Sequence, residues 1–176
     1  MSMTDGPVKI RTYHDADFAR TAALWTRINR ELAPVDMREL FEQYIATAIN
    51  EELRHLQVVF AEAERNAFWV VETAEELVGT FGIQSRGADI TELRRMYLDR
   101  RLRGRGIAQR MLDCAESRAR KFGFAKMILS TAEVQVAAIR FYKKSGFQVV
   151  STEVAAKMTT ATVGGGLTRF HFEKAL

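Results

Sequence analysis

The most informative stretch of the sequence is RRMYLDRRLRGRGIA, which runs from Arg94 to Ala108. It begins as a strand-like apolar run, continues as a basic turn with two glycines, and opens a helix-like run that extends to about Lys121. Glycine lets a backbone approach a ligand closely because it has no Cβ atom. The first amides of a helix lack intrahelical acceptors and lie at the positive end of the helix dipole. The stretch therefore predicts a phosphate-binding turn, the alternative being an ordinary basic turn.

Two well-known phosphate-binding motifs do not match this turn. A P-loop has Lys followed by Ser or Thr after its second glycine, whereas Gly106 is followed by Ile107 and Ala108. The dinucleotide motif has three spaced glycines and an acidic residue about 20 positions further on. Here no third glycine is reached, and residues Lys126–Leu129 stand at that distance. A nicotinamide cofactor is therefore disfavoured.

The turn resembles the pyrophosphate loop of the GCN5-related N-acetyltransferases, the GNAT superfamily. That pattern, Gln/Arg-x-x-Gly-x-Gly/Ala, is met by Arg103, Gly106 and Ala108. Glu92–Asp99 resembles the family strand before the loop, and Ala138–Phe147 resembles its second acetyl-CoA segment, so that the resemblance covers Asp89 to Val149. It implies acetyl-CoA as co-substrate, with contacts at Met96, Tyr97, Leu98, Arg103, Gly104, Arg105, Gly106, Ile107, Ala108, Gln135, Ala138, Phe141 and Tyr142. One departure is Gln135, where family members commonly have Asn.

Length and composition predict one ordinary globular domain over residues 4–176. A chain of 176 residues can bury about 70% of its unfolded surface, and 47% hydrophobic with 27% charged residues is typical of such domains. The single cysteine, Cys114, cannot form an internal disulfide, which favours a reducing compartment and a cytoplasmic location. No apolar run reaches the roughly 18 residues of a membrane span, and no secretory segment is expected at the N-terminus.

The net charge of +4 requires that nucleic acid be considered as a partner. The basic residues concentrate around the turn, at Arg94, Arg95, Arg100, Arg101, Arg103, Arg105 and Arg110. A phosphate-rich small cofactor such as coenzyme A explains this cluster as well as a nucleic acid backbone does. For Arg100, Arg101 and Arg110, a solvated basic face is an equally good explanation.

The periodicity predicts an α/β fold of the α+β mixed kind, with a mixed central sheet of about seven strands and about four flanking helices. Hairpins joined to βαβ units give the order β-α-α-β-β-β-α-β-α-β-β. The strands are expected at 8–13, 67–72, 77–83, 89–98, 126–131, 147–150 and 167–172, and the helices at about 15–28, 37–53, 107–122 and 136–145.

Two residues are candidates for proton transfer. Tyr142 matches the tyrosine of the family's Phe/Leu-Tyr pair, and its hydroxyl is protonated at neutral pH, so that it can donate to a leaving thiolate. The alternative is a core tyrosine. Glu92 lies where some family members carry a glutamate base, and it could take the proton of the attacking amine. The alternatives are a structural ion pair with Arg94 or a neighbouring strand, or a water chain as the base.

Arg94 and Arg95 stand next to each other in a strand that should be central, so their side chains are expected on opposite faces. At least one is expected to face the cleft or to pair with an acid, because an unpaired buried charge is costly. From the cleft it could hold an acceptor carboxylate in a bidentate bond. The histidines, His14, His55 and His171, are scattered without ligand spacing, so no metal is expected.

The sequence thus favours acetyl transfer from acetyl-CoA to a primary amine of a small molecule, peptide or protein. A non-catalytic acyl-CoA-binding module of the same fold and a nucleic-acid-binding protein are the alternatives. The acceptor walls are expected from Asn29–Glu42 and Ala155–Leu167, and Gly164–Gly166 is either a hairpin loop or a mobile loop at the acceptor site. A homodimer is possible, and the acceptor itself is not identified by any motif.

Overall fold

The computed structural model describes residues 7–176 and is built on one seven-stranded mixed sheet, in the order β1-β2-β3-β4-β5-β7-β6. Four helices of nine to fifteen residues and a one-turn helix, α3, flank it, so the predicted mixed α/β fold is confirmed. The strands are β1 (Lys9–Thr12), β2 (Ala67–Glu72), β3 (Leu77–Ser85), β4 (Ile90–Leu98), β5 (Lys126–Ala132), β6 (Gln148–Ala155) and β7 (Leu167–Ala175). The helices are α1 (Phe18–Leu32), α2 (Arg38–Thr47), α3 (Leu56–Val59), α4 (Ile107–Lys121) and α5 (Val136–Lys144).

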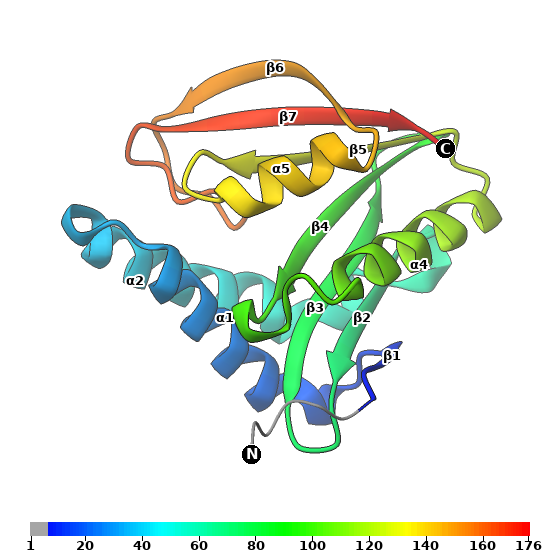
Figure 1. Cartoon of the computed structure of the whole chain (residues 1–176), viewed down its shortest axis with the longest axis horizontal. Coiled ribbons are helices and arrows are strands. Elements are labelled where there is room, and N and C mark those ends of the chain that lie inside the picture. The colour runs from blue at the N-terminus through cyan, green and yellow to red at the C-terminus, as the bar shows by residue number, and fades with distance from the viewer. Residues whose placement is uncertain (1–6) are drawn as a thin grey trace.

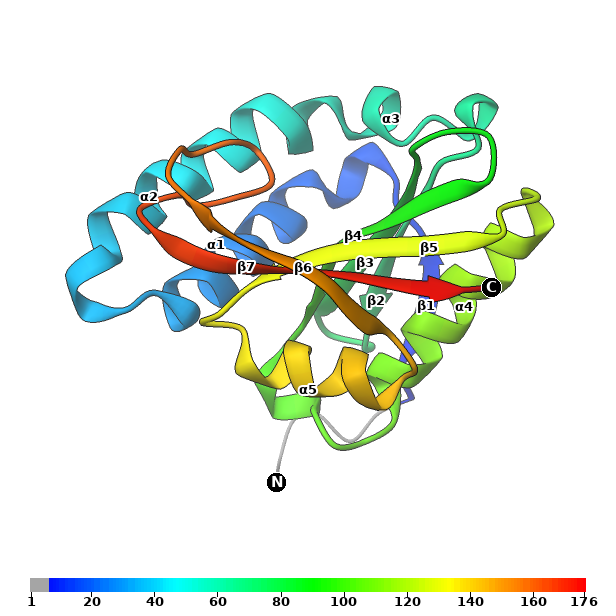
Figure 2. The ribbon, with the colours of Figure 1, turned by 90° about the horizontal axis from the view of Figure 1, so that it is seen from above.

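Helices cover both faces of the sheet. The helices α1, α2 and α3 lie on one face, and α4 and α5 lie on the other (Figure 1, Figure 2). The middle of strand β2 is apolar because both of its faces are buried. Phe68 and Val70 pack in the cluster under α1, whereas Trp69 and Val71 pack in the cluster under α4. Successive side chains of a strand point to opposite faces, so a strand covered on both sides has no polar positions to alternate.

The segment after α2 departs from the expected continuous helix. Beyond Thr47 the chain makes a π-helical turn over Ala48–Glu52 and a short 3-10 turn over Leu53–His55 before α3. A π-helical turn holds an extra residue, so it changes which side chains face inward. Glu52, which lies outside the apolar stripe of the sequence, is only 3% exposed as a result.

The two central strands diverge, and this divergence positions the site. Strand β4 pairs in parallel with β5 only where Ile90–Glu92 lie beside Lys126–Ile128. Further along, β5 continues as a partner of β7, while β4 continues as a partner of β3 (Figure 1). The backbone groups at the end of β4 that face β5 are therefore left without a neighbouring strand.

Candidate functional site

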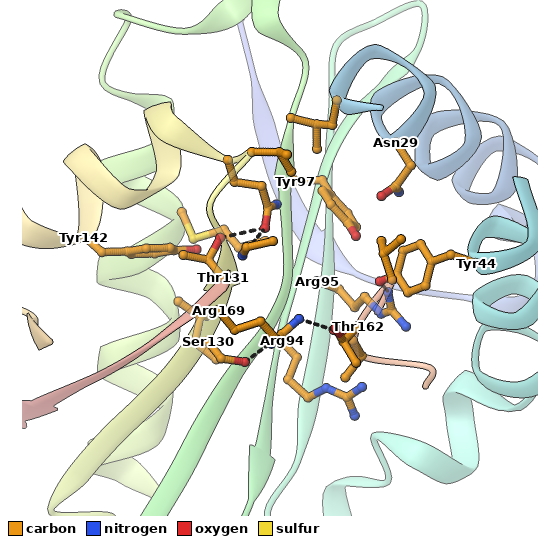
Figure 3. A pocket seen from close by; sticks show the side chains of 18 of the residues that line it. Asn29, Tyr44, Arg94, Arg95, Tyr97, Ser130, Thr131, Tyr142, Thr162 and Arg169 are labelled. Carbon is orange, nitrogen blue, oxygen red and sulfur yellow. Dashed lines mark hydrogen bonds between the residues drawn. The ribbon is translucent and has the colours of Figure 1, made fainter. Parts of the chain in front are cut away.

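A cavity lies in the wedge where β4 and β5 diverge (Figure 3). Residues 92–97 of β4 and 130–132 of β5 form its two main walls. Helices α1 and α2 and the loop between β6 and β7 close it, so both stretches that the sequence analysis expected around the acceptor contribute to one cavity. Their contributing residues are Asn29, Leu32, Phe41, Ala161, Thr162 and Val163.

A second cavity continues from the first. It runs past the end of β4 and the first turn of α5, and it reaches Arg103 of the glycine turn. Met96, Tyr97 and Gln135 line both cavities, so the two spaces meet at these side chains. Of the remaining expected cofactor contacts, Leu98 and Ala138 line the second cavity. Phe141 lines neither of the two cavities and packs instead against the core and Tyr142.

The glycine turn has the backbone geometry of an anion site. Gly104 and Gly106 adopt φ angles of 76° and 74°, a left-handed conformation that side chains disfavour. Helix α4 begins directly after Gly106, and the N–H of Arg110 donates the first intrahelical bond to the Gly106 carbonyl at 3.1 Å. The preceding helical amides, those of Ile107, Ala108 and Gln109, are therefore free to donate to a ligand.

The buried carboxylate of Asp99, just before the turn, binds two arginines. The Asp99 side chain is 0% exposed and accepts from the backbone N–H of Arg101 at 2.9 Å. Burial alone would raise the pKa of Asp99, but the hydrogen bonds from Arg101 and Arg27 outweigh it and hold that pKa below its ordinary value. The guanidinium of Arg103 has no hydrogen bond or ion pair to any residue from 7 to 176, so it can serve a ligand in the second cavity.

Gln135 is positioned to donate at the junction of the two cavities. Its side-chain oxygen accepts from Thr131 Oγ1 at 2.6 Å and from the Ala132 N–H at 3.2 Å. These bonds fix the carboxamide at the start of α5. Within the described chain its side-chain nitrogen has no acceptor. Although Gln135 stands where the family commonly has Asn, it still offers an amide donor at the expected cofactor site.

Tyr142 lies on α5 with its ring in the core and its hydroxyl toward the first cavity (Figure 3). The residue is 6% exposed, and its ring contacts those of Phe147 and Phe172 at centroid distances of 5.7 and 6.0 Å. No residue of the described chain hydrogen-bonds its hydroxyl. Burial raises the pKa of Tyr142, so the hydroxyl keeps its proton at neutral pH.

Glu92 lies at the closed end of the wedge, where β4 still pairs with β5. It lines the first cavity and is 18% exposed. Its carboxylate also forms an ion pair with Arg86, at 2.5 Å, in the turn between β3 and β4. The side chain therefore combines a cavity position with a structural partner, and the partner is Arg86 rather than Arg94.

The expectation that Arg94 and Arg95 point to opposite faces is wrong. Both guanidiniums bond to the carboxylate of Glu52, at 2.8 Å from Arg94 and 2.9 Å from Arg95. The reason is a bulge in β4, where Arg95 has a φ of 53° and the register with β3 shifts. The hydroxyl of Thr80 donates to the Arg95 carbonyl at 2.9 Å and holds this bulge. The expectation that one arginine pairs with an acid or faces the cavity is met by both.

Arg95 is the more deeply held of the pair. Its guanidinium also donates to Tyr44 Oη at 2.8 Å and lies 4.7 Å from the centre of the Trp25 ring. Burial disfavours its charge, but the neighbouring Tyr44 and the bonds to Glu52 outweigh burial and raise its pKa. The charged side chain of Arg95 therefore connects β4 to α1 and α2.

Arg169, on β7, is a cavity residue that the sequence analysis missed. It is 8% exposed, and it donates to the Ala161 carbonyl at 2.9 Å and to the Ser130 hydroxyl. Desolvation by burial lowers its pKa. The sequence did hold a signal for Arg169. The residue lies in a strand with Leu167, Phe170 and Phe172, and charged side chains are rare at buried strand positions.

Comparison with known proteins identifies the family. A model of the acetyltransferase (GNAT) family matches residues 30–147, more than half of the chain. The chain therefore belongs to the acetyltransferase (GNAT) family, and the resemblance seen in the sequence is confirmed.

Two curated relatives carry related names. N-acetylaspartate synthetase of Danio rerio is 30% identical over 114 residues, which cover 64% of this chain and 40% of that protein. The Escherichia coli (strain K12) protein called uncharacterized N-acetyltransferase YjgM is 34% identical over 105 residues, covering 58% of this chain and 62% of that protein. The matched regions thus span less than two thirds of these relatives' own lengths.

Solved structures show the same fold over nearly the whole chain. PaiA N-acetyltransferase of Thermoplasma acidophilum, solved with coenzyme A, has a TM-score of 0.75 at 20% identity and covers 97% of this chain and 99% of that one. An acetyltransferase of Streptococcus agalactiae has a TM-score of 0.75 at 16% identity, covering 96% and 98%.

Among residues 7–176, none of the helices is both long and apolar enough to cross a membrane. The same residues also contain no group of three or more His, Cys, Asp or Glu side chains arranged to hold a metal ion.

Proposed function

We propose that the protein transfers an acetyl group from acetyl-CoA directly to a primary amine, on a small molecule or on a peptide or protein. The observation that carries this proposal is the meeting of two cavities at Met96, Tyr97 and Gln135. One leads to the anion-binding turn, and the other is closed by charged and polar walls beside Tyr142. A donor and an acceptor can thus approach one point from two sides, and such positioning supplies about 7–11 kcal/mol in favourable cases.

The residues present fit coenzyme A. The free amides at the start of α4 and the unpartnered guanidinium of Arg103 suit its pyrophosphate. The end of β4, at Met96–Leu98, has backbone groups without a strand partner on the β5 side and suits its amide-bearing arm. When bound, acetyl-CoA supplies an acetyl group activated as a thioester. The relatives' names and the coenzyme A in a structure of the same fold support this assignment.

Tyr142 is the proposed proton donor. Transfer forms a C–N bond, breaks the C–S bond, removes a proton from nitrogen and requires one at sulfur. The Tyr142 Oη holds a proton that no described residue engages, in a position that opens into the first cavity.

Glu92 is the proposed base, directly or through water. Its carboxylate lines the same cavity, and its partner Arg86 is 40% exposed, so solvent also reaches this ion pair. An ordered water chain in place of Glu92 is the alternative base. The protein is in addition proposed to form one domain over residues 4–176, to act in the cytoplasm, and to be capable of forming a homodimer.

A thiol-release assay tests the proposal. The protein is mixed with acetyl-CoA and a panel of amines, and both free thiol and the N-acetylated product are measured. We expect equal amounts of thiol and product with at least one amine. Binding of acetyl-CoA without transfer to any amine would point instead to a non-catalytic acyl-CoA-binding module.

A further inference from the structure

Arg169 is a buried cation that forms no ion pair within residues 7–176. Its two described bonds go to neutral oxygens, the carbonyl of Ala161 and the hydroxyl of Ser130. It forms no ion pair with any carboxylate of residues 7–176. A buried charge is costly unless it is paired, so an unpaired one calls for an explanation.

The other charges around the cavity do not neutralise Arg169. Arg94 and Arg95 share the single carboxylate of Glu52, and the carboxylate of Glu92 is paired with Arg86. The guanidiniums of Arg94, Arg95 and Arg169 thus line the cavity with one carboxylate, that of Glu92.

One further acid lies near Arg169 in the sheet. Glu153 stands opposite Arg169 in the register of β6 and β7. Its side chain is 58% exposed, however, and contacts His171 at 3.1 Å instead. The cavity therefore carries an excess of positive charge, and the part of it at Arg169 is the least compensated.

Arg169 also has donors to spare. A guanidinium has five N–H groups, and two of those of Arg169 reach acceptors in the described chain. The two bonds that exist hold the guanidinium at the cavity wall, between Ser130 on one side and the loop at Thr162 on the other (Figure 3). Arg94 lines the same space and Tyr142 lies across it (Figure 3). A guanidinium fixed in this way matches a carboxylate, which it can bind with two parallel hydrogen bonds.

We propose that the acceptor amine carries a carboxylate and that Arg169 binds it, with Arg94 as a second guanidinium lining the same subsite. The acceptor is then a free amino acid or another small amino carboxylate, rather than a polyamine or a protein lysine. This inference rests on the proposed acetyl transfer, because it names the acceptor of that reaction. The carboxylate supplies the charge that Arg169 lacks, and its position fixes the amine on the side of the cavity that faces Tyr142.

Matched substrate pairs test the inference. Each of a set of amino acids is compared with its own C-terminal amide, because this change removes one charge and keeps the size. We expect the charged member to bind and to be acetylated, with its amide at least 10-fold weaker in kcat/KM. Removing the carboxylate also makes the amine easier to deprotonate, so a preference for the acid cannot come from amine reactivity.

Variants connect the preference to the residue. Arg169→Gln should raise KM for the amino acid by about 10- to 150-fold, which corresponds to a lost hydrogen bond to a charged group, and should abolish the discrimination between acid and amide. Arg169→Lys should retain part of the discrimination, because lysine keeps the positive charge but lacks the planar guanidinium that binds a carboxylate through two parallel hydrogen bonds. Arg120→Gln, the same exchange on α4 where the side chain is 52% exposed, is the matched control and should change neither value.

Calorimetry separates this inference from the proposed function. The protein saturated with coenzyme A is titrated with the acid and the amide of each pair, and only the acid should bind. If acids and amides bind equally, or if no amino carboxylate binds while uncharged amines do, the inference is overturned even where acetyl transfer occurs. Selective binding of acids without thiol release from any amine would instead contradict the proposed function and leave the carboxylate subsite standing.

Discussion

Removing the hydroxyl of Tyr142 is the sharpest test of the proposed chemistry. Tyr142→Phe keeps the ring, whose contacts with Phe147 and Phe172 lie at 5.7 and 6.0 Å. It breaks no hydrogen bond of the described chain, so we expect the free energy of unfolding to change by no more than about 0.5 kcal/mol. Proton donation typically contributes 10²- to 10⁴-fold, so turnover should fall by about that factor, or about 2.7–5.5 kcal/mol in activation free energy.

The assay is steady-state thiol release at saturating acetyl-CoA, together with calorimetric titration of acetyl-CoA. Turnover should fall in Tyr142→Phe while the dissociation constant stays within about twofold, because the hydroxyl acts on the leaving group rather than on binding. Tyr13→Phe is the matched control: this tyrosine is also 6% exposed, but it lies in the cluster under α1, outside both cavities. Equal turnover in wild type and Tyr142→Phe would make Tyr142 a core residue and refute the reasoning.

The pH dependence gives the same test a second readout. A proton donor must be protonated, so activity is lost as pH rises through its pKa. Because burial raises the pKa of Tyr142 above its ordinary value near 10, its ionisation should not limit the rate at any pH below about 10. An alkaline loss of activity near neutral pH that disappears in Tyr142→Phe would contradict this assignment.

Three further changes have defined outcomes. Gly106→Pro should abolish acetyl-CoA binding in a folded protein, because proline cannot adopt the φ of 74° at this turn; calorimetry with unchanged affinity would refute the loop assignment. Glu92→Gln should flatten the acidic limb of the pH–rate profile, since a base is inactive once protonated; a profile and rate identical to wild type would leave Glu92 as the structural partner of Arg86. Arg169→Met should raise Tm by about 2–4 °C for each kcal/mol that the uncompensated charge costs, measured by calorimetric melting without ligand; a lower Tm would show that the bonds to Ala161 and Ser130 outweigh that cost.

The residues of the proposed cofactor site could be picked out from the sequence because they lie close together in it. Arg103, Gly106 and the start of α4 fall within one turn, and their chemistry depends on backbone conformation that glycine spacing reveals. Gln135 immediately precedes the next helix and Tyr142 lies on it, at a spacing that the family resemblance covered. The fold followed from periodicity for the same reason, since each helix and strand carries its own apolar pattern.

The placement of Arg94, Arg95 and Arg169 could not be predicted because it depends on irregularities and on distant segments. The bulge at Arg95 turns it to the same side as Arg94, and strict alternation along a strand cannot foresee that. The π-helical turn carries Glu52 to both arginines across 42 and 43 positions of sequence. Arg169 meets Ser130 only through the pairing of β7 with β5, which needs the assembled sheet.

Detection of the acetylated product tests the central claim most directly. Wild-type protein is incubated with acetyl-CoA and amines that include paired amino acids and amides, and mass spectrometry measures N-acetylated amine alongside free thiol. We expect one acetylated amine for each thiol released, with amino carboxylates preferred. Thiol release without acetylated amine, or acetyl-CoA left intact with every amine, would contradict it.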